Sequence, residues 1–291
     1  MINKAIILCG GLATRFLPIS KCIPKEMLPI LNKPVIQYLV EDLVKSGINQ
    51  VLIINGRNKE SIVKLFDRNV EIEQRLQETN KQKLINDEYN LHNKVDVYFK
   101  QQCYAMGTAY AVKLAKEWVN GEPFVMLYGD ELLFNTGKNV VLQLIDSYQR
   151  NKNKSVIALQ ECAKEDVNKY GIIGFNKMIE DDYFINRIVE KPNIEDAPSN
   201  ISYIGPSLLT PEIFEEIDNL RQEKGKELIL TEAFNLLAKK DRLVGVKIHG
   251  ERLDVGNKLG LVKANVYFGL QDDLIKEELK KYLKHLINGD K

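Results

Sequence analysis

Six consecutive residues near the N-terminus combine a flexible backbone with donor groups that suit phosphate. They are Gly10, Gly11, Leu12, Ala13, Thr14 and Arg15. Glycine lets the chain turn sharply and brings backbone N–H groups close to a ligand. The hydroxyl of Thr14 and the rigid fork of donors on Arg15 add to this set. The sequence therefore predicts a phosphate-binding glycine turn at residues 10–15.

Two further cations follow the turn within a segment that is interrupted by prolines. Prolines at positions 18, 24 and 29 keep this segment out of α-helix, so we expect Lys21 and Lys25 on an extended loop that folds back over the same anion. The turn matches neither of the common nucleotide loops, GxxxxGK followed by Ser or Thr, and GxGxxG opening directly into a helix. An alternative interpretation is a plain glycine turn beside solvated lysines.

The composition of the chain limits the classes of partner. The 291 residues carry 41 basic and 40 acidic side chains, a net charge of +1, which argues against a nucleic-acid groove or a membrane surface. Four cysteines without CxxC spacing and three distant histidines argue against a zinc site or a disulfide framework. There is no signal-peptide pattern and no apolar run near the roughly 20 residues of a spanning helix. We therefore expect a cytoplasmic protein.

The elements around the glycine turn read as the start of a parallel sheet. A buried strand is predicted at residues 4–9, an amphipathic helix at residues 35–46 and a second strand at residues 51–54. Strand, helix and strand at this spacing predict a right-handed βαβ unit. The loop after the second strand would emerge at the same sheet edge, where Arg57 and Lys59 could reach the ligand, but we expect them to be solvated.

The rest of the chain continues this alternation. Further strands are predicted at residues 95–99, 123–128, 155–160 and 184–189, and a helix at residues 108–118. The pattern favours an α/β fold that is doubly wound, with a mostly parallel central sheet flanked by helices. Because the sequence contains no repeat or linker, we expect residues 1–291 to form a single domain.

Two segments lie outside this alternation. Residues 71–93 are strongly charged with weak apolar periodicity, and we expect surface helices or a subunit contact there. The tail at residues 272–287 is amphipathic, and we expect it to pack against the body or against a second subunit. A homo-oligomer, either a dimer or a tetramer, is the expected assembly.

The glycine turn and a second motif together resemble a known signature. The runs GGLATR at residues 10–15 and PKEMLP at residues 24–29 resemble the GGxGTR and PKxxLP motifs of the sugar nucleotidyltransferases. Ala13 stands where that family usually has glycine. The resemblance implies a Rossmann-like nucleotidyltransferase fold with a small sugar-binding β portion. It also implies that residues 10–14 bind the nucleotide and that Arg15 and Lys25 hold its phosphates.

Gln102 and Gly107 carry a second resemblance. Their spacing is similar to that of the bacterial UTP–glucose-1-phosphate uridylyltransferases, in which a glutamine and a glycine contact uracil. A carboxamide both donates and accepts hydrogen bonds, which fits uracil, although a flipped amide also satisfies cytosine. Ala109 stands where these relatives have another glycine.

Two aspartates are candidate metal ligands. Asp130 follows a predicted central strand, at the edge where a doubly wound sheet has its ligand crevice. The resemblance places a magnesium-binding aspartate here and a second one at Asp254, so Mg²⁺ is the implied cofactor. If the resemblance is set aside, Asp130 is interpreted as a residue that stabilises a turn or caps a helix, and Asp254 as a carboxylate that a helix N-terminus favours.

Three further residues resemble the sugar-phosphate site of the same family. Gly171 lies in the run YGII, and Glu190 and Lys191 begin the run EKP. The resemblance implies that the backbone of Gly171 meets the sugar and that Glu190 accepts hydrogen bonds from its hydroxyls. Lys191 would neutralise the sugar 1-phosphate. The residues 204–206 fall where relatives carry glycine–arginine, so a basic contact is absent here.

The resemblance runs from residue 4 to about residue 269 and implies uridylyl transfer from UTP to glucose 1-phosphate, giving UDP-glucose and pyrophosphate. A phosphate monoester has a second pKa of about 6, so its attacking oxygen is largely ionised at neutral pH and needs no general base. The implied catalytic residues are Arg15, Lys25, Asp130 and Lys191. Three alternatives stay open: the same chemistry on another nucleotide or sugar phosphate, such as dTTP, a non-catalytic homologue that binds nucleotide sugar, and a dinucleotide-dependent oxidoreductase.

Overall fold

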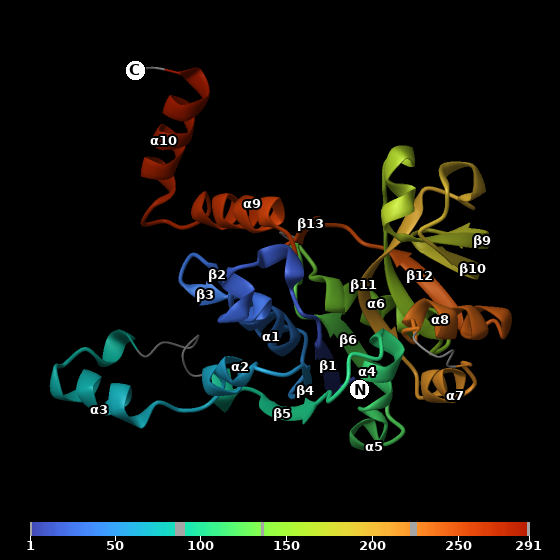
Figure 1. The fold of residues 1–291 in the computed structure, drawn as a ribbon, viewed down its shortest axis with the longest axis horizontal. Coiled ribbons are helices and arrows are strands. Elements are labelled where there is room, and N and C mark those ends of the chain that lie inside the picture. Colours follow the sequence, from blue (N-terminus) through green and yellow to red (C-terminus); the bar gives the residue numbers. More distant parts are fainter. Residues whose placement is uncertain (1, 85–90, 135–136, 222–225, 290–291) are drawn as a thin grey trace.

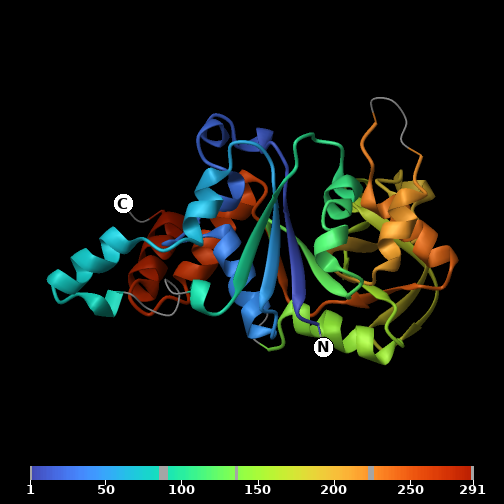
Figure 2. The same ribbon diagram turned by 90° about the horizontal axis from the view of Figure 1, so that it is seen from below.

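The computed structural model describes residues 2–84, 91–134, 137–221 and 226–289. Within these residues nine strands form one sheet, in the order β5-β4-β1-β6-β11-β8-β12-β10-β9, with helices on both faces (Figures 1 and 2). In strand β1 (Lys4–Cys9), Ile7 packs in one apolar cluster with helix α1 (Val35–Lys45), whereas Ile6 packs in the other with α8 (Leu230–Lys239). The predicted α/β architecture with helices on both faces is confirmed.

The first half of the sheet is parallel. It contains β5 (Asp96–Gln101), β4 (Gln50–Asn55), β1 and β6 (Phe124–Tyr128), and every neighbouring pair runs in the same direction. Lys4 lies opposite Gln50 on one side and Phe124 on the other, so the carboxyl ends of these strands are level. The loops that leave them therefore share one edge of the sheet, as the sequence predicts.

The second half corrects the prediction of a mostly parallel sheet. It contains β11 (Ile201–Leu209), β8 (Ser155–Glu161), β12 (Leu243–Lys247), β10 (Asp182–Glu190) and β9 (Gly171–Ile179). Here β11 is antiparallel to both β6 and β8, and β10 is antiparallel to both β12 and β9. Only residues 180 and 181 join β9 to β10, and so short a connection permits a hairpin but no crossover. The sheet is mixed.

A small antiparallel ribbon beside the main sheet brings together residues from two distant parts of the chain. It consists of β7 (Glu131–Phe134) and β13 (Glu251–Asp254), with Asp254 directly opposite Glu131. Strand β7 begins where the loop after β6 ends, so the pairing carries Asp254 to the carboxyl edge of the parallel half. A second ribbon pairs β2 (Pro29–Ile30) with β3 (Lys33–Pro34).

Most helices follow the sequence pattern, with two local differences. The single helix predicted at residues 108–118 is divided into α4 (Thr108–Lys113) and α5 (Lys116–Val119). The segment expected to be an extended loop is instead a series of 3-10 turns at Thr14–Phe16, Ile19–Lys21 and Lys25–Met27. The remaining helices are α2 (Glu60–Leu65), α3 (Val70–Glu78), α6 (Val140–Arg150), α7 (Glu212–Asp218), α9 (Lys258–Gly269) and α10 (Lys276–Asn288).

Two helices extend away from the body of the molecule (Figure 1). Helix α3 buries no side chain, which confirms the predicted surface helix, while residues 85–90 of that segment lie outside the described residues. Helix α10 buries none either, and Tyr282, Leu286 and Ile287 are exposed. The prediction that the tail packs against the body is therefore wrong for the face that carries these three residues. None of the helices described is long and apolar enough to cross a membrane.

Candidate active site

The glycine turn lies at the end of β1, between two neighbouring loops. A Cβ atom on Gly10 would overlap the side-chain Oε1 of Gln102, and a Cβ atom on Gly56 would lie 2.9 Å from the carbonyl oxygen of Gly10. A Cβ atom on Gly11 would lie 3.4 Å from Nζ of Lys25. A larger residue at position 10 would displace the side chain of Gln102, the residue predicted to bind the base.

Ala13 adopts the left-handed backbone conformation, with φ of 54° and ψ of 39°. This conformation costs an ordinary residue roughly 1–2 kcal/mol and glycine almost nothing. It therefore explains why glycine is usual at this position of the family motif. The turn keeps the shape that glycine favours although the residue is alanine.

A cavity of about 230 Å³ opens at the carboxyl edge of the parallel half. Its lining includes Gly10, Gly11, Lys25, Gln102, Ala105, Gly107, Thr108, Tyr128 and Asp130. The predicted nucleotide residues Leu12, Ala13 and Thr14 are not part of this lining. The structure thus joins the two glycines of the turn with the glutamine and glycine of the second motif.

Gly107 has a structural role that its neighbours define. Its φ is +97°, and a Cβ atom there would overlap the backbone of Leu228. The N–H of Leu228 donates a hydrogen bond to the carbonyl group of Met106 at 2.9 Å, and the N–H of Ala109 donates one to the carbonyl group of Leu228 at 3.0 Å. Ala109 is fully buried at the start of α4 and fits its position. The loop that carries Gly107 is therefore tied to the start of α8.

Lys25 points into the cavity and pairs with an aspartate. Its Nζ lies 2.6 Å from Oδ2 of Asp130, and both side chains are largely buried. Burial is the largest single influence and lowers the pKa of Lys25, but the charge and hydrogen bond of Asp130, together with the charge of Glu26, raise it overall. The next residue, Glu26, points the other way and pairs with Lys59 at 2.7 Å, where both side chains are buried. The prediction of a solvated Lys59 is therefore wrong, because the side chain turns inward to meet Glu26.

The two predicted metal ligands lie on either side of Gly256. A Cβ atom on Gly256 would lie 2.5 Å from Oδ2 of Asp130 and 2.9 Å from Oδ1 of Asp254, so only glycine leaves room for both carboxylates. Asp254 accepts hydrogen bonds from the N–H of Gly256 at 2.9 Å and from Nδ2 of Asn257 at 3.0 Å. Among the described residues, no group of three or more Asp, Glu, His or Cys has metal-binding geometry. The arrangement is a pair of carboxylates.

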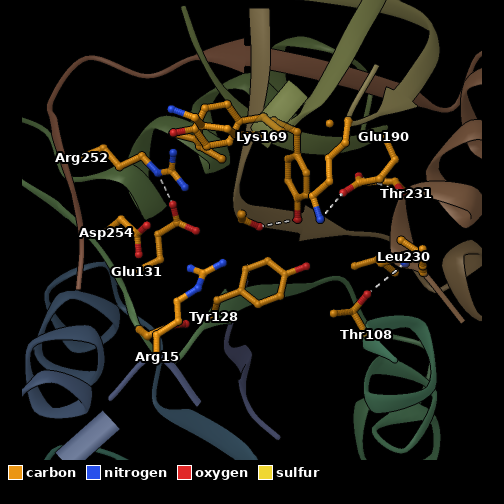
Figure 3. Close-up of a pocket in the computed structure, with 18 residues that line it drawn as sticks. Arg15, Thr108, Tyr128, Glu131, Lys169, Glu190, Leu230, Thr231, Arg252 and Asp254 are labelled. Carbon is orange, nitrogen blue, oxygen red and sulfur yellow. Dashed lines mark hydrogen bonds and ion pairs between the residues drawn. The ribbon is translucent and has the colours of Figure 1, made fainter. Parts of the chain in front are cut away.

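A larger cavity of about 410 Å³ adjoins the first and is shown in Figure 3. Its lining includes Arg15, Thr108, Tyr128, Asp130, Glu131, Tyr170, Gly171, Glu190, Lys191, Thr231, Arg252 and Asp254. Arg15 lies on this side and points between Glu131 and Tyr128. The two cavities share Thr108, Tyr128 and Asp130, so they meet at the end of β6.

The predicted sugar-phosphate residues lie together in the larger cavity. Glu190 accepts a hydrogen bond from Oγ1 of Thr231 at 3.4 Å, and a Cβ atom on Gly171 would lie 3.1 Å from the same carboxylate. Lys191 has φ of 47°, a strained conformation for a residue with a side chain, and its N–H bonds the carbonyl group of Tyr170 at 2.9 Å. Such strain is typical of binding sites.

Glu131 and Arg252 form an ion pair in this cavity that the sequence analysis missed. Burial raises the pKa of the Glu131 carboxyl to about 7, although Arg252 acts in the opposite direction. Arg252 also lies over the ring of Tyr170, 5.1 Å from its centre. Each member is a close sequence neighbour of a predicted metal ligand, but the pair becomes visible only once β7 and β13 are in register.

Comparison with known proteins agrees with this geometry. Residues 4–269 match the model of the nucleotidyl transferase family. A UTP–glucose-1-phosphate uridylyltransferase of Streptococcus pyogenes is 40% identical over 291 residues, covering 98% of this chain and 96% of that protein. A UTP-bound UGPase from Acinetobacter baumannii has a TM-score of 0.91 and 32% identity, covering 98% of this chain and 100% of the other. A UDP-glucose pyrophosphorylase complexed with UDP-glucose has a TM-score of 0.85 and 36% identity, covering 94% and 100%. The chain therefore belongs to the nucleotidyl transferase family, in the group of the UTP–glucose-1-phosphate uridylyltransferases.

Proposed function

We infer that the chain transfers the uridylyl group of UTP to glucose 1-phosphate, giving UDP-glucose and pyrophosphate. The observation that carries this inference is the pair of adjoining cavities that meet at Asp130. The smaller cavity has the glycines and buried amide that suit a nucleotide, and the larger one has the polar lining that suits a sugar phosphate. Two reactants held on either side of one carboxylate are positioned for transfer.

On the nucleotide side, we assign the base to Gln102 and Gly107 and the phosphates to the backbone of the glycine turn. Gln102 supports this role because its side chain is largely buried and lines the cavity, where a bound base can meet its amide. Lys25 supplies a cation beside Gly11 of the turn. The role of Leu12, Ala13 and Thr14 in nucleotide binding stays a prediction.

On the sugar side, we assign Glu190 to the sugar hydroxyls, the backbone of Gly171 to the sugar ring and Lys191 to the 1-phosphate. Glu190 is held by Thr231, so its carboxylate is oriented before substrate binds. The side chain of Lys191 is more than half exposed at the cavity wall, where an anion can reach it. Arg15 points into the same cavity and is suited to phosphate oxygens between the two reactants.

The residues of the site act by position and charge. The attacking phosphate oxygen is already ionised at neutral pH, so no residue needs to remove a proton from it. Lys191 would orient this phosphate toward the α-phosphorus of UTP, while Arg15 and Lys25 would stabilise the charge that develops on the transferred group and on the leaving pyrophosphate.

The carboxylates of Asp130 and Asp254 fit the proposed cofactor Mg²⁺. Magnesium is commonly held by one or two carboxylates together with substrate phosphates and water, and Gly256 keeps the space between these two oxygens clear. Asp130 and Asp254 would hold Mg²⁺, which when bound would supply positive charge that stabilises the reacting phosphates. Lys25 pairs with Asp130, and we infer that it gives up this carboxylate when it serves a nucleotide phosphate.

Pyrophosphate release measured across the nucleoside triphosphates and several sugar 1-phosphates tests the assignment. We expect UTP with glucose 1-phosphate to be the best pair. Equal or better turnover with dTTP would move the chain to thymidylyl transfer, since Gln102 recognises an edge that uracil and thymine share. Absence of turnover with every pair would support the non-catalytic alternative.

Three further properties stay predictions. We propose a single domain over residues 1–291 and a cytoplasmic location, in agreement with the sequence pattern. For a homo-oligomer, the exposed apolar residues of α10 offer a face that a second subunit would cover. Sedimentation of the purified chain would measure the assembly.

A further inference from the structure

The 3-10 turn at Lys25–Met27 presents two neighbouring charges in opposite directions. Nζ of Lys25 reaches Oδ2 of Asp130 at 2.6 Å on the cavity side. Oε1 of Glu26 reaches Nζ of Lys59 at 2.7 Å on the protein side. The first pair lines the nucleotide cavity, whereas the second does not. The turn is therefore attached by ion pairs on both sides.

Glu26 occupies a closely packed position between several loops. Its side chain has an exposed fraction of 0%, and that of Lys59 is 7%. A Cβ atom on Gly129 would lie 2.8 Å from Cγ of Glu26 and 2.7 Å from Sγ of Cys9. Loops that follow β1, β4 and β6 thus converge on this one carboxylate, and all three leave the carboxyl edge that carries the cavity.

Stability alone gives a weak reason for this arrangement. Removing two charges from water costs several kcal/mol per ion, and a buried pair commonly contributes no more to folding than apolar residues of similar volume. Glu26 is also incompletely satisfied, because its Oε2 has no hydrogen-bond partner among the residues that the structure describes. A buried ion pair does, however, hold its two elements in one defined orientation.

We propose that the Glu26–Lys59 ion pair is a positioning device for nucleotide binding, which holds the turn at Lys25–Met27 in place while Lys25 exchanges Asp130 for a phosphate of UTP. The proposal rests on the role assigned above to Lys25. Once Lys25 leaves Asp130, the cavity-side ion pair of the turn is lost, and the Glu26–Lys59 pair still holds the turn from the protein side. Both residues act through Lys25 and contact no substrate.

Steady-state kinetics of Glu26→Gln, Lys59→Met and the double variant test this role, with Lys25→Ala as the reference. Each single variant leaves one buried charge without its partner, so its folding must be checked by thermal melting. The double variant leaves no unpaired charge, and we expect it to melt near the wild type. We expect all three to raise KM for UTP by about tenfold while KM for glucose 1-phosphate stays within about twofold.

The double variant separates positioning from stability. If it melts like the wild type and also has the wild-type KM for UTP, the ion pair is only structural and the proposal is wrong. Glu216→Gln is the matched control, because Glu216 is a buried carboxylate that pairs with Lys240 and lines neither cavity. We expect the KM values of this control to be those of the wild type, and a raised KM for UTP in the control would overturn the proposal.

The reference variant distinguishes failure of this inference from failure of the proposed function. If Lys25→Ala raises KM for UTP but Glu26→Gln and the double variant do not, the site assignment stands and the positioning role is refuted. If Lys25→Ala leaves KM for UTP unchanged, the assignment of Lys25 to the nucleotide phosphates is wrong, and the positioning role is refuted with it.

Discussion

The two halves of the sheet build their cavities by different means. In the parallel half, strands β4, β1 and β6 end level, and the cavity there is lined largely by short residues and backbone of the loops that follow. In the mixed half, the cavity is lined by long charged and aromatic side chains, such as Glu190, Arg252 and Tyr170. Glycine contributes space on one side, and side-chain chemistry contributes contacts on the other.

This difference indicates how each half should respond to mutation. A site made from close backbone approach is sensitive to a single added methyl group where the nearest atoms belong to the backbone, as they do at Gly107. In a site made from long side chains, removing a charge should weaken binding of the ligand that the charge contacts and leave binding of the other ligand unchanged. Asp130 lies where the two cavities meet and belongs to both kinds of site.

The largest effect is expected at this border. Asp130→Asn keeps the volume and removes the charge, so we expect turnover to fall by about a hundredfold or more. The same change leaves Lys25 without its partner, so we expect the free energy of unfolding to fall by about 1–2 kcal/mol. Relief of repulsion between the two carboxylates alone would instead predict a gain in stability. Kinetics and urea unfolding measure the two effects.

Asp254→Asn is the matched comparison for Asp130→Asn. We expect a smaller loss of turnover, because Asp130 still offers one carboxylate to the proposed ion. An Asp130→Asn variant that keeps near-normal turnover and the same magnesium dependence would rule out the carboxylate pair as the metal site.

In the mixed half, Lys191→Ala should act on the sugar phosphate alone. A hydrogen bond to a charged group is worth about 1.5–3 kcal/mol, so we expect KM for glucose 1-phosphate to rise by roughly tenfold to a hundredfold. Binding of UTP, measured by calorimetry, should be unchanged. Lys169→Ala is the control, because Lys169 lines the same cavity and pairs with Asp166, as Lys191 pairs with Glu190. A variant that loses UTP affinity and keeps its sugar-phosphate KM contradicts the assignment.

In the parallel half, Gly107→Ala should act through backbone overlap. A Cβ atom there would meet the backbone of Leu228, and φ is +97°, so we expect a loss of about 1–3 kcal/mol in stability together with weaker UTP binding. Gly121→Ala is the control, since φ is +76° and no atom lies within 4 Å of its added Cβ. Equal losses in both variants would show that backbone strain alone, and not contact with Leu228, governs this position.

The smallest effect is expected at Ala13. Because φ is 54°, Ala13→Gly should relieve left-handed strain and raise the free energy of unfolding by about 0.5–1 kcal/mol, with UTP binding at least as tight. Ala197→Gly, where φ is −67°, should instead lower stability slightly through the entropy of the unfolded chain. A large loss of UTP affinity in Ala13→Gly would show that the methyl group packs in the bound turn.

Local sequence predicted the parallel half well and the mixed half poorly. The strand at residues 4–9 and the helix that follows depend on apolar periodicity, which is visible in the chain itself. Strand direction in the mixed half depends on which strands become neighbours, and β11 inserts between β6 and β8 from a distant part of the sequence. The short link from β9 to β10 was the one local signal of an antiparallel hairpin there.

The site shows the same limit. Motif residues such as Gln102, Asp130 and Glu190 were found because each stands in a recognisable run, and the structure brings them to adjoining cavities. Lys59 and Arg252 stand in no such run, and their partners are distant in sequence. A charge in a loop reads as solvated until the fold places an opposite charge beside it.

The shared wall of the two cavities has a consequence for the kinetics of the whole enzyme. UDP-glucose contains a nucleotide and a sugar in one molecule, so a bound product would occupy both cavities at once across Thr108, Tyr128 and Asp130. Neither UTP nor glucose 1-phosphate can then enter. Product inhibition should therefore be competitive toward both substrates, and the rate would respond to accumulating UDP-glucose without any separate regulatory site.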